Sequence, residues 1–115
     1  MSNVSAAHVS ATLARAGYPR ATDPGQTDSG YGESGFFVHV ENANWADGGR
    51  VVIVSQQVSE YENNYSDRVY EIVGRIVEEA LDRYTGTLRQ SGYVVEDWVR
   101  YDGVRLGLFV VSREG

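Results

Sequence analysis

The chain contains no cysteine and no lysine, and it has only two prolines and two histidines. Without cysteine it has no disulfide bond, zinc–thiolate site, thiol redox chemistry or cysteine nucleophile. The core must therefore hold the fold together without such links, and 115 residues fit one domain spanning residues 1–115. We expect no cofactor.

Long apolar segments are also missing. A membrane helix needs about 18 or more consecutive apolar residues, and no stretch of this sequence approaches that length. The opening residues, 1–5, lack the basic start and apolar run of a secretory signal. These features predict a cytoplasmic protein that does not interact with the membrane.

All ten cationic side chains are arginine, and they are outnumbered by sixteen acids, which gives a net charge of -6. Arginine codons are rich in GC, so this composition favours a GC-rich genome, such as that of an actinobacterium or its phage. A net-negative protein lacks the attraction to phosphates on which general nucleic-acid binding depends. We therefore expect the partner to be a second copy of the chain, giving a homodimer, or another protein, rather than nucleic acid.

Two helices are predicted from apolar residues that recur every three or four positions. The first covers about residues 5–16. The second is long and covers about residues 59–91, where Ser59 and Glu62 match a capping box. Asn63-Asn64 and Thr85-Gly86-Thr87 are weak points at which this helix could break or kink. A glycine stands where each predicted helix should end, Gly17 and Gly92.

Each predicted helix precedes a predicted β-hairpin. Residues 36–41 and 51–56 form the first pair of strands, and residues 93–100 and 104–112 form the second around an Asp-Gly turn. The order α-β-β-α-β-β predicts an α+β domain with a four-stranded, mostly antiparallel sheet and both helices on one face. The halves share the pattern Leu-x-x-x-Gly-Tyr, which fits either a duplication or a common way of ending a helix.

Residues 17–35 contain both prolines and are rich in glycine, serine and aspartate, so we expect a long, mobile loop. Gly30, Gly32 and Gly35 match the spacing of a dinucleotide-binding motif. That motif needs a strand before it and a helix after it, whereas here a loop precedes and a strand follows. We interpret the glycines as loop residues.

Catalytic patterns are absent from the rest of the chain. His8 and His39 lie in different predicted elements without metal-ligand spacing. The neighbouring acids Glu78-Glu79 and Glu96-Asp97 point to different sides of their elements, so neither pair is arranged as an acid–base dyad. The sequence gives no positive indication of an enzyme, a catalytic residue or a metal site.

The predicted sheet has one unusual property. Strand alternation turns one set of apolar side chains toward the helices: Phe36, Val38, Val40, Val95, Val99, Leu106, Leu108 and Val110. The side away from the helices, which we call the outer face, should normally be polar. Here it also carries aromatic side chains, and we predict an interface made by Phe37, His39, Trp98, Arg100, Arg105 and Phe109.

Three explanations fit an apolar outer face. It could pack against a second copy, bind a different protein, or be covered by the 17–35 loop through Tyr18 or Tyr31. The first two make the chain a non-enzymatic interaction protein. The acids of the long helix offer a second surface for that role: Glu71, Glu78, Glu79 and Asp82.

Two other functions compete with this hypothesis. The 17–35 loop could close as a lid over a small-molecule or catalytic pocket near His39 and Trp98. Alternatively, the aromatic and arginine side chains of the outer face could stack single-stranded nucleic acid, although the net charge argues against it.

Overall fold

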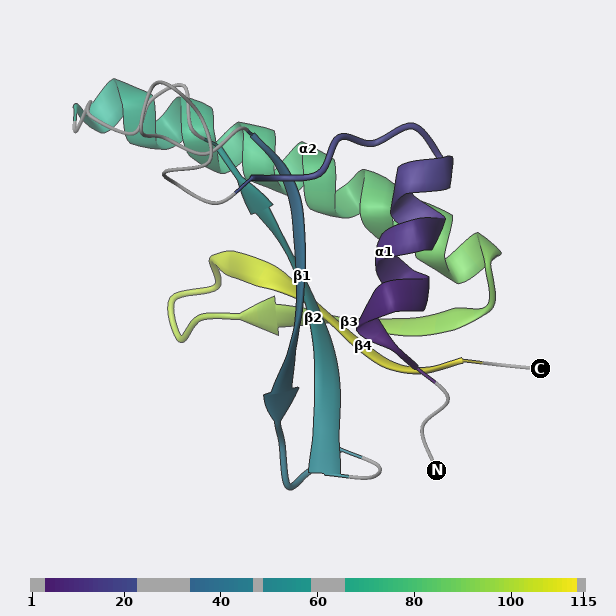
Figure 1. Cartoon of the computed structure of the whole chain (residues 1–115). Coiled ribbons are helices and arrows are strands. Elements are labelled where there is room, and N and C mark those ends of the chain that lie inside the picture. Colours follow the sequence, from purple (N-terminus) through teal and green to yellow (C-terminus); the bar gives the residue numbers. More distant parts are fainter. Residues whose placement is uncertain (1–3, 23–33, 47–48, 59–65, 114–115) are drawn as a thin grey trace.

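The computed structural model describes residues 4–22, 34–46, 49–58 and 66–113, and it confirms the predicted fold class. Two helices cover one face of a four-stranded antiparallel sheet (Figure 1). The elements in chain order are α1 (Ala6–Arg15), β1 (Gly35–Asn42), β2 (Arg50–Gln57), α2 (Asp67–Gln90), β3 (Tyr93–Val99) and β4 (Arg105–Arg113). No helix within these ranges is long and apolar enough to cross a membrane.

Helix α1 begins and ends at the residues that the sequence indicates. The Ser5 side chain caps it by accepting a hydrogen bond from the His8 backbone N–H. At the other end Gly17 has a φ of +97°, and the N–H of Tyr18 donates to the carbonyl of Leu13. This left-handed turn is a glycine-dependent helix stop, and it directs Tyr18 back toward the helical layer.

Helix α2 starts later than predicted. Its N-cap is Ser66, which is extended (φ -72°, ψ 152°) and whose side chain accepts a hydrogen bond from the N–H of Val69. The extended Ser66 therefore interrupts the helix predicted from residue 59. The predicted capping pair Ser59 and Glu62 lies outside the described residues. The helix ends as expected, with Gly92 at a φ of +88°.

The sheet consists of two hairpins joined along a short seam. The strand order is β1-β2-β4-β3, and the pairs β1–β2 and β3–β4 extend along whole strands. Between β2 and β4 only Val52 to Val54 pair with Leu108 to Val110. The hairpins consequently cross at a steep angle in Figure 1. Each half thus contributes one edge strand, β1 or β3, and one inner strand, β2 or β4.

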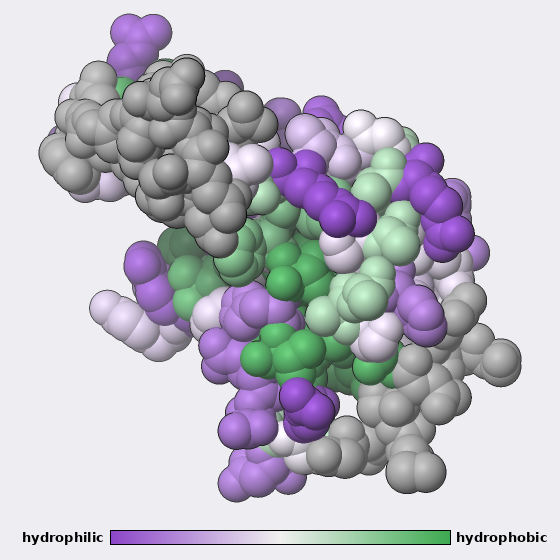
Figure 2. Space-filling model, in the orientation of Figure 1, coloured by the Kyte–Doolittle hydropathy of each residue, from purple (hydrophilic) through white to green (hydrophobic). Residues whose placement is uncertain are grey.

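The main core lies between the helices and the sheet. Its buried members are Val9, Leu13, Phe36, Val52, Val54, Ala80, Leu81, Tyr84, Leu88, Tyr93, Val95, Leu108 and Val110. Figure 2 shows apolar residues gathered across the middle of the molecule, with polar residues around them. Burying several branched aliphatic side chains supplies the main stabilisation, at about 1.5–3 kcal/mol for each.

Tyr18 belongs to this helical layer. Its ring meets the Tyr84 ring edge-on, with centroids 5.0 Å apart, and its hydroxyl lies 3.1 Å from the Thr87 hydroxyl. One hypothesis had Tyr18 or Tyr31 covering the outer face. Tyr18 does not cover it, because its ring packs on the helical side. Most of the predicted 17–35 loop, including Tyr31, lies outside the described residues.

Candidate functional site

Four of the six predicted interface residues share the outer face. Phe37 and His39 come from β1, Trp98 from β3 and Phe109 from β4. Register places His39 opposite Ile53 in β2, Ile53 opposite Phe109, and Phe109 opposite Glu96. The outer face is thus a continuous surface that crosses all four strands.

Three aromatic rings form an array on this face. Trp98 stacks on Phe109, with ring centroids 5.6 Å apart and planes at 29°. Trp45 meets Phe109 edge-on at 5.1 Å, and 58% of Trp45 is exposed. A cleft of about 220 Å³ beside the array is lined by Trp45, Ala46, Glu96, Val111 and Ser112. Offset and edge-on ring contacts of this kind are the favourable geometries for aromatic pairs.

Sequence reasoning missed Trp45, because it stands among turn-forming residues between β1 and β2. The turn folds back over the outer face and makes a second, small core with Ala43, Val51 and Ile53 buried in it. The N–H of Ala43 donates to the carbonyl of Gly49, which holds the turn closed. The only available signal was a tryptophan at the tip of a hairpin whose second strand is apolar on both sides.

At the β1 side of the face, Phe37 is 37% exposed and its ring is tilted against His39, with centroids 6.1 Å apart. The Nε2 atom of His39 lies 3.2 Å from Glu41 Oε1, while His39 Nδ1 has no hydrogen-bond partner among the described residues. The outer face therefore has an aromatic centre, and along β1 it has a polar margin that carries the Glu41 carboxylate.

Arg105 does not lie on the outer face. Trp98 pairs with Gly107 and Val99 with Arg105, so Leu106 is an extra residue that forms a β-bulge. A bulge reverses the alternation, and Arg105 points toward α2. Gly107 fits this position because a Cβ there would lie 2.7 Å from the Val54 carbonyl oxygen. The same bulge leaves Leu106 36% exposed, although alternation predicted that it faces the helices.

Arg105 is instead the centre of an ion-pair cluster. Its guanidinium lies 2.9 Å from Glu78, 2.7 Å from Asp82 and 2.9 Å from Asp97, and its side chain is only 14% exposed. Burial alone would lower the pKa of Arg105, but the hydrogen bonds to Asp82 and Glu78 and the charge of Asp97 outweigh burial and raise it. Arg105 stays charged and links α2 to β3 and β4.

Arg100 lies in the turn between β3 and β4, two residues after Trp98, and pairs with Asp102. Its Nε donates to Asp102 Oδ1 at 2.9 Å, and a second nitrogen bonds Oδ2. The hydrogen bond from Arg100 lowers the pKa of Asp102 to about 2. This exposed pair closes the hairpin turn, which predicts a local structural role for Arg100.

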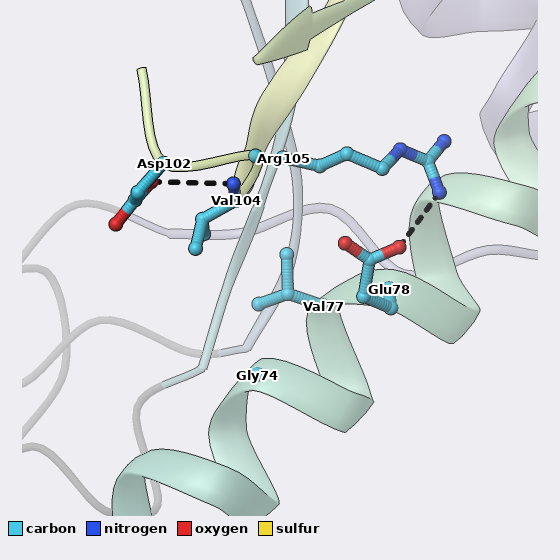
Figure 3. Close-up of a pocket in the computed structure, with 7 residues that line it drawn as sticks. Gly74, Val77, Glu78, Asp102, Val104 and Arg105 are labelled. Carbon is cyan, nitrogen blue, oxygen red and sulfur yellow. Dashed lines mark hydrogen bonds and ion pairs between the residues drawn. The ribbon is translucent and has the colours of Figure 1, made fainter. Parts of the chain in front are cut away.

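The predicted acidic helix surface is divided. Glu78 and Asp82 bind Arg105, whereas Glu71 and Glu79 are exposed. Beside Glu78, a cleft of about 420 Å³ separates α2 from the turn that precedes β4 (Figure 3). Its lining residues are Gly74, Val77, Glu78, Asp102, Gly103, Val104 and Arg105.

A third cleft, of about 310 Å³, lies on the helical side near Tyr18, Gln56, Arg83 and Tyr84. The Tyr84 hydroxyl donates to Gln56 Oε1, and burial raises the pKa of Tyr84 to about 12. The raised pKa favours the neutral phenol, the form in which the Tyr84 hydroxyl donates to Gln56. Among the described residues, no group of three His, Cys, Asp or Glu side chains could hold a metal ion.

Comparison with known proteins adds no further information. No protein-family model, no curated protein and no solved structure matches this chain. The candidate site is therefore defined by its geometry alone, as the outer face with its Trp45–Phe109–Trp98 array.

Proposed function

We propose that this chain is a small, acidic, non-enzymatic interaction protein that binds a partner protein through its outer face. The observation that carries the proposal is the aromatic array, in which Trp45 is 58% exposed above stacked Phe109 and Trp98. Tryptophan side chains of this kind are the commonest energetic centres of protein interfaces. Exposed apolar patches in soluble proteins usually mark such interfaces.

The charges around the array specify the partner further. Glu41 and Glu96 are exposed at the outer face. By contrast, Arg100 pairs with Asp102 in the β3–β4 turn, and Arg105 pairs with acids of α2. A complementary surface would carry apolar side chains at its centre and arginine or lysine at its rim. The same distribution disfavours single-stranded nucleic acid, because both arginines of the hypothetical stacking platform are already paired with carboxylates.

A small-molecule site near His39 and Trp98 has less support. The clefts described above are lined by other residues, and only the smallest of them adjoins the aromatic array. The acidic surface of α2 also has less support, because Arg105 binds two of its four predicted acids. The outer face is therefore the surface that we favour.

A displayed peptide library selected against the purified protein tests the proposal. We expect enriched peptides that combine aromatic or aliphatic residues with arginine or lysine. Because an interface tryptophan typically contributes 2 kcal/mol or more, about a 30-fold change in affinity, Trp45→Ser and Trp98→Glu should weaken their binding by at least about tenfold.

The matched control is Tyr101→Ser, which removes a 99% exposed ring from the opposite hairpin turn. Peptide binding to this variant should be unchanged, and thermal unfolding should show that all three variants remain folded. Failure to select any peptide, or binding that is as strong to Trp45→Ser and Trp98→Glu as to the wild type, would overturn the proposal.

A further inference from the structure

The free edge of β1 is a second surface, distinct from the outer face. The Phe36 N–H donates to the Pro19 carbonyl, and the Phe36 carbonyl accepts from the Ala21 N–H, so this residue's backbone points away from β2. Strand alternation directs the backbone groups of Val38, Val40 and Asn42 to the same side. Strand β1 lies at the edge of the sheet, and among the described residues only the bridge at Phe36 pairs with that edge (Figure 1).

The opposite edge, β3, is protected in ways that β1 is not. Two register shifts interrupt the pairing of β3 with β4, and the Arg89 side chain donates a hydrogen bond to the Val95 carbonyl. Bulges and charged side chains are the usual devices that prevent edge strands from pairing. By contrast, the register of β1 with β2 is unbroken, and the exposed side chains Phe37 and Val40 stand on its two faces.

We propose that the free edge of β1 pairs with β1 of a second copy of this chain, antiparallel and about a two-fold axis. Outward-facing groups can meet in symmetric alignments centred on Val38, His39, Val40 or Glu41. The first two place the second strand beside Phe36, where residues 19–21 already pair. The alignment centred on Glu41 sets that acid against itself. Only the alignment centred on Val40 pairs the whole edge from Val38 to Asn42, which no described residue occupies.

Charge complementarity supports the same alignment. It places His39 opposite Glu41 of the second copy, twice, on the outer face. Opposite charges in cross-strand pairs are favourable and like charges are not. The His39-centred alignment would instead set His39 against His39. In the chosen register the two exposed Val40 side chains meet on the helical side, and about six backbone hydrogen bonds form between the strands.

This pairing joins two four-stranded sheets into one and sets two outer faces side by side. It does not rest on the proposed function, because the edge of β1 and the Trp45–Phe109–Trp98 array are separate surfaces. A dimer without partner binding, or partner binding without a dimer, would each leave the other proposal standing.

A single introduced cysteine tests the alignment directly, because the chain has none of its own. In Val40→Cys the two thiols should face each other across the two-fold axis, with Cβ atoms about 4.5–5.5 Å apart, within reach of a disulfide after slight adjustment. We expect mild oxidation to convert most of this variant to a covalent dimer within minutes. The control is Tyr101→Cys, in the exposed turn, which should form little covalent dimer under the same conditions. Equal cross-linking of the two variants would overturn the alignment.

Light scattering tests the dimer without a cross-link. The wild type should show twice the monomer mass of 12.7 kDa. Val40→Pro removes one outward N–H without touching the β1–β2 ladder, so it should give a folded monomer, whereas Val40→Thr keeps the N–H and should remain dimeric. A wild type that stays monomeric up to about 1 mM, the weak end of specific association, would overturn the proposal. A dimer that persists in folded Val40→Pro but is lost in Trp45→Ser would also overturn it, since the outer face would then be the dimer interface.

A charge swap provides a test that does not depend on proline. His39→Glu places two acids opposite each other and should weaken the dimer at least tenfold. Adding Glu41→His restores one acid and one histidine in each cross-strand pair and should recover most of the affinity. If the double variant is as weak as His39→Glu, the register centred on Val40 is wrong.

Discussion

The two halves of the sheet share one plan, a helix followed by a hairpin, yet their hairpins differ in how each one ends. The β1–β2 turn folds back and places Trp45 over the outer face, and beyond Phe36 no described residue pairs with the β1 edge. The β3–β4 turn is closed on itself by Arg100 and Asp102.

The strands of the second hairpin are also tied to the rest of the fold. They are interrupted by bulges and connected to α2 through Arg105. The first half thus contributes an exposed turn with Trp45, whereas the second half contributes Trp98 and Phe109 to the outer face and is connected to α2 by Arg105.

The largest expected effect concerns the seam and the bulge beside it. Leu108 is fully buried at the seam, and Leu106, two residues earlier, is 36% exposed. Leu108→Ala should lower the free energy of unfolding by about 3 kcal/mol, because a buried leucine leaves a cavity. Leu106→Ala should cost less than about 1 kcal/mol. Urea denaturation measures both, and equal losses would mean that strict alternation, without a bulge, describes β4 better.

The next effect separates the two arginines of the second hairpin. Arg105→Gln leaves Glu78, Asp82 and Asp97 without their shared cation, and we expect a loss of about 1–3 kcal/mol in the free energy of unfolding. Arg100→Gln, in the exposed turn, is the matched control and should change stability by less than about 0.5 kcal/mol. If the two variants lose the same stability, Arg105 is not the link between α2 and the second hairpin.

The smallest effect is local to the turn. The hydrogen bond from Arg100 lowers the pKa of Asp102 from 3.8 to about 2. In an NMR titration toward acid, the Asp102 carboxylate should therefore gain its proton only near pH 2. The stabilisation from this pair is fully present above pH 3.8 and is lost as the pH falls through about 2. In Arg100→Gln the pKa of Asp102 should rise toward the ordinary value, about 3.9. An unchanged titration would show that Arg100 does not hold this turn.

Much of the fold could be predicted because it depends on local signals. Apolar spacing gave the order of helices and strands, and Gly17 and Gly92 marked the helix ends through backbone conformations that glycine favours. The start of α2 was harder. Ser59 and Ser66 are both plausible caps by residue type, and nothing local distinguishes the serine that begins this helix.

The outer face could be predicted only in part. Phe37, His39, Trp98 and Phe109 follow from strict alternation, which holds at these four positions. Arg105 does not, because a bulge depends on how two strands pair, and Gly107 was the only local hint of one. Trp45 escaped the prediction because its position depends on how the turn packs against strands that are distant in sequence.

The short seam between β2 and β4 has a consequence for the rate of folding. Each hairpin pairs strands that follow one another in the chain, so each can form early through short-range contacts. Residues from opposite halves of the chain meet at the seam, in the packing of the helices and where Trp45 contacts Phe109. We therefore expect the slow step to be the docking of two partly formed halves, whose encounter closes the sheet and the core at once.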